Sequence, residues 1–291
     1  KKNSFAVVPA CFDGTASYLK GSANGPQAVL NASRFLELFD EEFENEPFRK
    51  SIATLCPLEF GRATPPEKMC KKVQGVVGAL LEKGVFPLVI GGEHSISVGA
   101  AKAAFDFCKG DFSVIHLDAH ADLRDEYEFS RFSHACALKR MRDFCKSTLS
   151  IGVRSLSKEE WDFAAKENVR ILYKKDLEGL SLRDLEKKIE GEIARLNKNI
   201  YLTIDLDVLD PCEMPSVGTP EPNGLRFAEA VKIIAAVAKR KNVVGADLVE
   251  LCPIQGLEAP NFSAAKLAYK VFAAVTASNE AEALVKKASK V

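Results

Sequence analysis

The chain has 291 residues, of which 47% are hydrophobic and 27% charged, a balance typical of a globular protein that buries a large core. Lys plus Arg and Asp plus Glu both total 40, so no net charge attracts the protein to nucleic acid or to an anionic membrane. The sequence has neither a signal-peptide pattern nor a membrane-spanning apolar run, and we expect a cytoplasmic protein. Without a linker-like break in composition, a single α/β domain over residues 1–291 is predicted.

Several common site types are excluded by the absence of their motifs. The eight cysteines are scattered without a Cys-x-x-Cys pair, so we expect small buried side chains and not a zinc ribbon or a disulfide framework. No nucleophile elbow, P-loop or dinucleotide fingerprint occurs, which argues against nucleophilic-serine, P-loop and Rossmann cofactor chemistry.

Short apolar strands alternate with helices along the chain. Such alternation favours a parallel sheet covered by helices on both faces. From the N-terminus, the predicted strands cover residues 5–9, 52–55, 85–90, 112–117, 147–153, 199–204 and 243–249. The predicted helices begin near Pro26, Pro65, Ile96, Ser133, Ser157, Leu182, Arg226 and Ser263.

Two loops between these elements stand out. The Gly/Ser/Asn-rich loop 13–26 is either simple turn chemistry or part of a pocket rim. The segment 211–224 contains four prolines, whose fixed φ angles predict a rigid wall and not a disordered lid.

Acidic and imidazole residues gather where the predicted strands end. In extended backbone, a spacing of two places side chains on the same side of a strand, and this spacing recurs here. Because the carboxyl ends of parallel strands meet at one edge of a sheet, we expect these residues to share one site. They are His94 after the strand 85–90, Asp118, His120 and Asp122 after 112–117, and Asp205 and Asp207 after 199–204.

This residue set is typical of a site for two divalent cations. Four carboxylates about 5 Å apart would repel by roughly 3 kcal/mol per pair at an effective dielectric of about 20, so the cluster requires counter-charge. Two imidazoles and four carboxylates without a thiolate suit Mn²⁺, with Fe²⁺, Co²⁺ or Zn²⁺ as alternatives. Two such ions activate water, which predicts hydrolysis.

The alternative to a metal site is that these residues only stabilise the turns at the strand ends. Any one of these strand ends alone would be an ordinary turn, and Gly91-Gly92 before His94 could be a tight turn or an anion site. Three such strand ends coincide in a chain with four histidines, and this coincidence favours the metal site. His116 shares the alternation but lies inside its strand, so we interpret it as a buried structural histidine.

Several motifs, in this order, resemble the ureohydrolase family, the arginases and agmatinases. They are Gly-Gly-Glu-His-Ser (91–95), Asp-Ala-His-Ala-Asp-Leu-Arg (118–124), Ser-His-Ala (133–135), Asp-Leu-Asp-Val-Leu-Asp-Pro (205–211), Gly-Thr-Pro-Glu-Pro (218–222) and Val-Glu-Leu-Cys-Pro (249–253). The resemblance implies an arginase-like, three-layer α/β/α fold with a mainly parallel sheet of about eight strands. It also implies two Mn²⁺ per chain and a homo-oligomer, a trimer or a hexamer.

The resemblance implies a role for each site residue. One ion would be held by His94, Asp118, Asp122 and Asp205, and the other by Asp118, His120, Asp205 and Asp207. Hydroxide bridging the ions would attack the guanidinium carbon, with Asp122 accepting its hydrogen bond. Glu250 would receive the substrate guanidinium, and His134 would transfer a proton or position the substrate.

The residue at position 124 indicates which substrate the protein accepts. Arginases typically carry Asp-Ile-Asn where this chain has Asp122-Leu123-Arg124, and that asparagine helps to bind the carboxylate of arginine. Its absence, together with Glu93 in the motif 91–95 and the continuation Leu-Arg-Asp-Glu-Tyr (123–127), resembles an agmatinase, which converts agmatine to putrescine and urea in polyamine biosynthesis. Guanidinobutyrate or arginine as substrate, or a non-catalytic binding protein on the same fold, are the alternatives. Leu30 and Asn223 depart from the family pattern near the predicted pocket rim.

Overall fold

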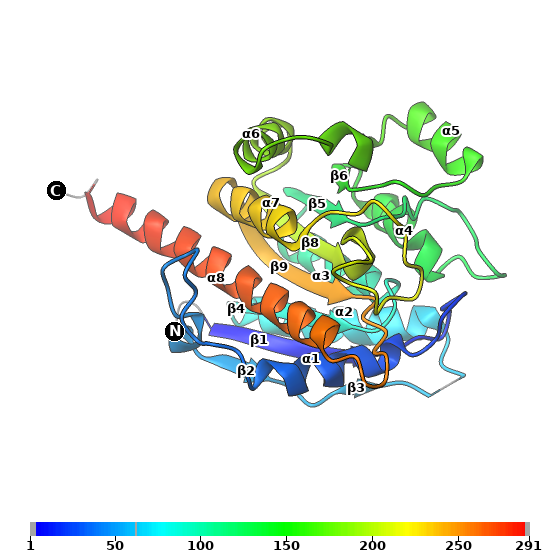
Figure 1. The fold of residues 1–291 in the computed structure, drawn as a ribbon, viewed down its shortest axis with the longest axis horizontal. Coiled ribbons are helices and arrows are strands. Elements are labelled where there is room, and N and C mark those ends of the chain that lie inside the picture. The colour runs from blue at the N-terminus through cyan, green and yellow to red at the C-terminus, as the bar shows by residue number, and fades with distance from the viewer. Residues whose placement is uncertain (1–3, 62, 289–291) are drawn as a thin grey trace.

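A parallel sheet of nine strands lies between two layers of helices (Figure 1). The computed structural model describes residues 4–61 and 63–288, with side chains as far as residue 281. The strands are β1 (Ser4–Cys11), β2 (Ile52–Thr54), β3 (Leu58–Glu59), β4 (Val85–Gly91), β5 (Phe112–Leu117), β6 (Thr148–Ile151), β7 (Arg170–Leu172), β8 (Asn199–Asp205) and β9 (Asn242–Val249). Their order is β2-β1-β4-β9-β8-β5-β6-β7, and β3 also pairs with β1. The predicted three-layer α/β/α architecture is confirmed.

Two groups of helices cover the two faces of the sheet. The helices are α1 (Gly25–Ser33), α2 (Pro66–Glu82), α3 (Ile96–Phe107), α4 (Ala137–Phe144), α5 (Lys158–Lys166), α6 (Leu182–Ile193), α7 (Phe227–Arg240) and α8 (Ala259–Ala288). In one layer, α8 contacts both α1 and α7, and α7 contacts α6. In the other layer, α3 contacts both α2 and α4. Each layer buries its own apolar core against the sheet, which explains the continuous apolar sequence of the central strands.

The capping and hydrophobic patterns of the sequence predicted most helices and strands correctly. Ser157 accepts a hydrogen bond from the main-chain N–H of Glu160, whose carboxylate accepts from the N–H of Ser157, so α5 begins with the capping box that its sequence predicts. On α6, Leu185, Ile189 and Ile193 are buried at helical spacing. Among the described residues, no helix has both the length and the apolar character needed to cross a membrane.

The structure differs from the prediction at the edges of the sheet and in its last helix. β3 and β7 were not predicted, because strands of two and three residues are too short to show an alternation. Together with the seven strands predicted from the sequence they make nine, one more than the family resemblance implies. Helix α8 begins at Ala259, four residues before the predicted start, with Pro260 in its first turn, where a missing N–H costs nothing.

Candidate metal centre and active site

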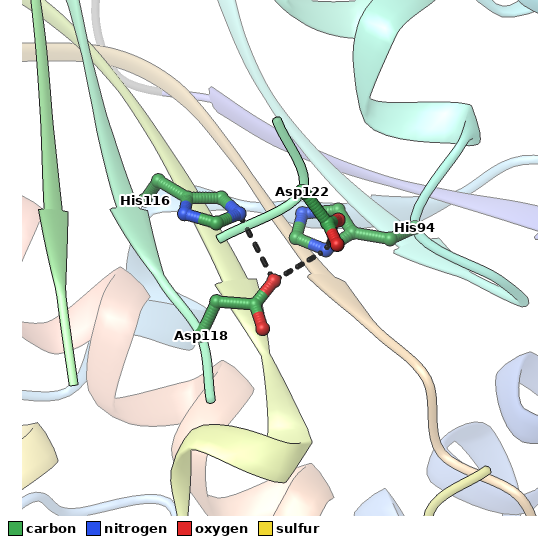
Figure 2. A group of neighbouring side chains, drawn as sticks. All are labelled: His94, His116, Asp118 and Asp122. Carbon is green, nitrogen blue, oxygen red and sulfur yellow. Dashed lines mark ion pairs between the residues drawn. The ribbon is translucent and has the colours of Figure 1, made fainter. Parts of the chain in front are cut away.

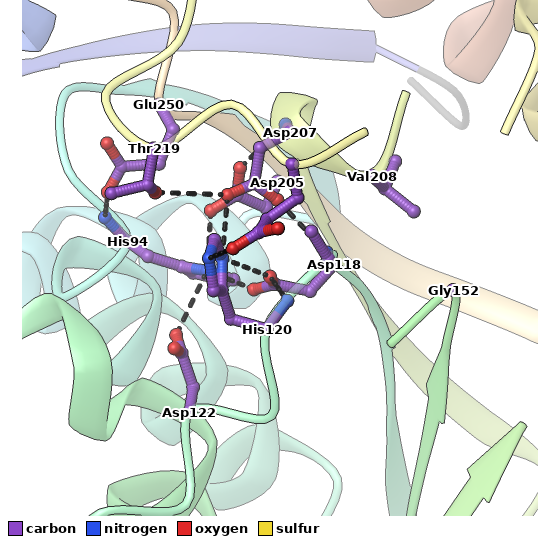
Figure 3. Close-up of polar contacts among 12 residues, drawn as sticks. His94, Asp118, His120, Asp122, Gly152, Asp205, Asp207, Val208, Thr219 and Glu250 are labelled. Carbon is purple, nitrogen blue, oxygen red and sulfur yellow. Dashed lines mark hydrogen bonds and ion pairs between the residues drawn. The ribbon is translucent and has the colours of Figure 1, made fainter. Parts of the chain in front are cut away.

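Four adjacent strands in the middle of the sheet bring the predicted site residues together. In the order β4-β9-β8-β5, their carboxyl ends carry His94, Glu250, Asp205 and Asp118. These strands are far apart in the sequence, yet their ends lie side by side (Figure 3). All six residues predicted as metal ligands therefore lie in one cluster at this edge, where open α/β sheets bind ligands.

His94 is the centre of the cluster. Its Nδ1 lies 2.9 Å from Asp118 Oδ2, 3.0 Å from Asp205 Oδ2 and 3.4 Å from Asp122 Oδ2. Its Nε2 lies 2.8 Å from Thr203 Oγ1, and that hydroxyl donates to Asp247 Oδ1 at 2.6 Å. Because the Thr203 proton is used in this way, its oxygen accepts from His94 Nε2–H, and in the neutral ring Nδ1 keeps a free lone pair facing the carboxylates.

His120 forms the second half of the cluster. Its Nδ1 lies 2.9 Å from Asp207 Oδ2 and 3.5 Å from Asp118 Oδ1. Main-chain N–H groups hold these carboxylates in place: Asp207 Oδ1 accepts from Ala119 N at 3.0 Å, and Asp118 Oδ1 accepts from His120 N at 2.5 Å. The carboxylates are thus oriented by the backbone of the strand ends.

His116 is buried inside β5, and it also touches the cluster. Its Nε2 lies 2.9 Å from Asp118 Oδ2, its Nδ1 lies 2.7 Å from Ser150 Oγ, and its ring stacks on that of His94 at 5.0 Å (Figure 2). The alternation of β5, which places 116 and 118 on the same side, is the sequence signal for this contact. His116 therefore packs as a buried residue and orients Asp118.

The donor set fits divalent cations. Potential ligand atoms of His94, His116, Asp118 and Asp122 lie within 4.8 Å of one another, and a second such group consists of Asp118, His120 and Asp207. The buried atoms His94 Nδ1, His116 Nε2 and Asp118 Oδ2 face one another without a hydrogen bond. Buried polar atoms are rarely left unpaired; a cation held by His94 Nδ1 and Asp118 Oδ2 would satisfy both, while His116 Nε2 stays 2.9 Å from Asp118 Oδ2.

Burial is the main cause of the raised pKa values of the carboxyl groups in the cluster. Burial raises the pKa of Asp122 well above its usual range, and the neighbouring charge of Asp118 adds to this shift. Burial also raises the pKa of Asp205, to which Asp207 contributes. Without cations the cluster therefore holds protons, which divalent ions would displace.

Two residues of the site have a left-handed backbone. Asp122 has φ of 52° and Glu250 has φ of 68°, a conformation that costs about 1–3 kcal/mol for a residue other than glycine. Both are held by main-chain hydrogen bonds, from Lys139 N to Asp122 O at 2.8 Å and from Glu250 N to Gly92 O at 2.7 Å. Such strain clusters at functional sites, because only the surrounding structure maintains it.

Glu250 and His134 lie beside the cluster. Glu250 Oε1 accepts from His94 N at 2.6 Å and lies 3.9 Å from His134 Nδ1. Burial raises the pKa of Glu250 well above its usual value, and burial lowers the pKa of His134 to about 4, with the charge of His120 adding to the second shift. A cavity of about 290 Å³ opens here, lined among others by Arg124, His134, Asp122, Asp205, Asp207 and Glu250.

Both loops that the sequence left without a role contact this cavity. Ser17, from the loop 13–26, lines it, so this loop belongs to the pocket rim. Thr219, from the proline-rich loop 211–224, lines it as well, and its hydroxyl lies 3.5 Å from Asp207 Oδ2. This loop therefore forms part of the cavity wall.

Arg154 was missed by sequence reasoning. It follows β6, and its guanidinium donates to the main-chain oxygens of Asp207, Glu221 and Pro222 at 2.7, 2.8 and 2.9 Å. Three longer contacts at 3.3 Å reach the carbonyls of Gly152, Val208 and Leu209. No local pattern marks it, because five of its six partners lie more than 50 residues further along the chain.

Comparisons with known proteins agree with this fold and site. The sequence profile of the Arginase family matches residues 3–274. An N(1)-aminopropylagmatine ureohydrolase of Synechocystis sp. is 37% identical over 91% of this chain and 87% of its own. The agmatinase of Bacillus anthracis is 38% identical over 83% of this chain and 81% of its own. The crystal structure of the agmatine ureohydrolase of Thermoplasma volcanium superposes with a TM-score of 0.86 at 29% identity, covering 96% of this chain and 92% of the other.

The fold and the cluster define a class: an enzyme of three-layer α/β/α architecture with a carboxylate–imidazole cluster suited to metal ions at the carboxyl edge of its sheet. Within that class, the chain belongs to the arginase family and is an agmatinase-like ureohydrolase. The family resemblance indicated by the sequence motifs is confirmed.

Proposed function

We propose that the protein hydrolyses the guanidino group of agmatine to give putrescine and urea, with two Mn²⁺ bound per chain. The observation that carries this proposal is Glu250. Its carboxyl group is buried beside the cluster, and among the described residues the one ion-pair partner within reach is His134 Nδ1, at 3.9 Å. A substrate guanidinium would provide the charge-assisted pairing that a buried carboxylate requires.

The six clustered side chains would hold the cations. His94, Asp118, Asp122 and Asp205 would bind one ion, and Asp118, His120, Asp205 and Asp207 the other, so Asp118 and Asp205 are shared. When bound, the two ions supply a water molecule of lowered pKa as the nucleophile. The mixed nitrogen and oxygen donors favour Mn²⁺ over the alternatives Fe²⁺, Co²⁺ and Zn²⁺.

Three side chains would then guide the reaction. Glu250 holds the guanidinium so that its carbon faces the cluster, and Asp122 accepts a hydrogen bond from the nucleophilic water. His134 is neutral near pH 7 because burial lowers its pKa to about 4, and its Nδ1 faces Glu250. It takes up the proton that the nucleophilic water loses on adding to the guanidinium carbon, and it passes this proton to the alkyl nitrogen, which leaves as the amine when the C–N bond breaks and urea forms.

Arg124 bears on the tail of the substrate. Its guanidinium lies 5.1 Å from the centre of the Tyr127 ring, its Nε lies 3.8 Å from Glu160 Oε2, and about a third of its side chain is exposed at the cavity. Glu160 thus offsets its charge, and the carboxylate-binding asparagine of arginases is absent. This arrangement supports a substrate without a carboxylate. A tail longer than that of agmatine is the second candidate, because four similar relatives are named N(1)-aminopropylagmatine ureohydrolase.

Urea release from four compounds tests the proposal. The Mn²⁺-loaded protein is assayed with agmatine, N(1)-aminopropylagmatine, guanidinobutyrate and arginine, and kcat/KM should be highest for agmatine. A higher value for arginine would contradict the argument from Arg124, and a higher value for the aminopropyl compound would establish the second candidate. Glu250→Gln should lower kcat/KM at least about a hundredfold. Glu159→Gln, on the exposed face of α5, is the matched control and should retain activity.

The quaternary state belongs to the same proposal. We infer a homo-oligomer, a trimer or a hexamer, from the family resemblance. Light scattering of the purified protein should give a mass of three or six chains, and a monomeric mass would contradict it.

A further inference from the structure

Glu93 is a buried carboxylate that the proposed chemistry leaves unused. It accepts three hydrogen bonds: from Thr15 N to Oε2 at 2.6 Å, from Thr15 Oγ1 to Oε1 at 2.5 Å, and from Ser95 Oγ to Oε1 at 2.5 Å. In the described part of the chain, no basic side chain lies within ion-pair distance of it. Glu93 therefore fastens the loop that follows β1 to the turn that follows β4.

Thr15 connects this anchor to His134. A threonine hydroxyl has one proton, and Thr15 donates it to Glu93, so its oxygen serves as the acceptor for His134 N at 3.0 Å. Two residues further along the same loop, Ser17 Oγ lies 3.1 Å from His134 Nε2. The loop 13–17 thus contacts both the main chain and the imidazole ring of a residue more than 110 positions away.

His134 has few restraints from its own segment. It begins the 3-10 helix η3 (His134–Cys136), which has no side-chain cap at Ser133. Its ring nitrogens have two neighbours on opposite sides, Glu250 at Nδ1 and Ser17 at Nε2. Because a proton-transfer group works only within hydrogen-bond reach of its target, the orientation of this ring matters for the reaction.

We propose that Thr15 and Ser17 are positioning residues for His134, and that Glu93 acts through Thr15. This inference rests on the proposed function, in which His134 transfers the proton. The loop 13–17 sets the position of the His134 main chain through Thr15 and the rotation of the imidazole through Ser17. None of residues 13–17 is among the six side chains proposed to hold the cations.

Thr15→Val tests the proposal, because valine keeps the shape of threonine and removes both hydroxyl contacts. We expect kcat for agmatine to fall roughly ten- to a hundredfold, while KM stays within about twofold and bound Mn²⁺ is unchanged. Thr15→Ser keeps the hydroxyl and should retain most of kcat. Ser17→Ala should show a smaller fall in kcat alone. Thr54→Val, at an exposed threonine of the edge strand β2, is the control and should behave like the wild type.

A double-mutant cycle with His134→Gln separates positioning from general weakening of the structure. If Thr15 acts through His134, then Thr15→Val should lower kcat less than about twofold further in the His134→Gln background. An equal fall in both backgrounds would overturn the proposal, as would an unchanged kcat in Thr15→Val.

Amide hydrogen exchange gives a readout that needs no activity. The amide of His134 should exchange faster in Thr15→Val and remain protected in Thr15→Ser and Thr54→Val. Unchanged protection in Thr15→Val would overturn the positioning role even in a protein that releases no urea. If the wild type releases no urea but the His134 amide exchanges faster in Thr15→Val, the proposed function is refuted and the structural link between Thr15 and His134 stands.

Discussion

Replacing Arg154 by lysine should loosen the loop that carries Asp207 and the pocket wall. The guanidinium donates to six main-chain oxygens on three segments, three of them at 2.7–2.9 Å. Lysine keeps the charge, but its single nitrogen cannot reach oxygens arranged around a planar fork. Asp207 O, Glu221 O and Pro222 O are the oxygens most affected.

The expected loss follows from the number of unpaired carbonyls. Each buried acceptor left without a partner costs about 1–3 kcal/mol, and the lower part of this range applies because Arg154 is half-buried and water can replace some contacts. With one contact retained by lysine, we expect a loss of about 2–4 kcal/mol in the free energy of unfolding. In a chain of this size the melting temperature would fall by roughly 5–10 °C.

The effect should extend to the cations. Asp207 Oδ2 lies 2.9 Å from His120 Nδ1, and the carbonyl of the same residue is held by Arg154 at 2.7 Å. Loss of a residue that orients a ligand typically lowers metal affinity ten- to a hundredfold. Thermal unfolding and calorimetric titration with Mn²⁺ measure the two effects, with Arg183→Lys, on the exposed face of α6, as the control.

A null result would refute this reasoning. If Arg154→Lys melts within about 2 °C of the wild type and binds Mn²⁺ equally well, then water or the lysine replaces the guanidinium, and the prolines alone hold the loop. A fall in stability with unchanged Mn²⁺ affinity would limit Arg154 to the pocket wall.

Four further predictions address other parts of the molecule. Asp205→Asn should leave less than two Mn²⁺ per chain and abolish urea release; full metal content by elemental analysis would contradict the shared-ligand assignment. Since burial raises the pKa of Asp122 and Asp205, Mn²⁺ binding should release protons and strengthen as pH rises; equal heats in buffers of different ionisation enthalpy would argue against it. Lys270→Met leaves the buried Asp40, 3.0 Å from Lys270 Nζ, without its cation and should cost about 3–5 kcal/mol in denaturant unfolding. Phe129→Gly should stabilise the protein by about 1 kcal/mol, because Phe129 is fully exposed with φ of 64°; a lower melting temperature would show that the side chain has a partner.

The donor types and their place at strand ends were readable from the sequence. Burial on both faces makes each central strand a continuous apolar run, so the point where such a run ends is visible in the sequence. Asp118, His120 and Asp122 follow one run and Asp205 follows another, and parallel strands place these ends at a single edge. The prediction of a metal site at this edge therefore follows from residue type and spacing alone.

The contacts between strand ends were decided by the tertiary structure. The order β4-β9-β8-β5 brings Glu250 between His94 and Asp205, although β9 comes last in the chain. Strand order depends on which faces pack best across the whole sheet, and no local window of sequence contains that information. The same limitation hid the contacts of Arg154 with the segments that follow β8 and the contact between Thr15 and Glu93, because these partners are distant in sequence and polar. The periodicity of hydrophobic residues indicates which side of a helix or strand is buried. A long-range hydrogen bond depends instead on positions that only the folded chain defines.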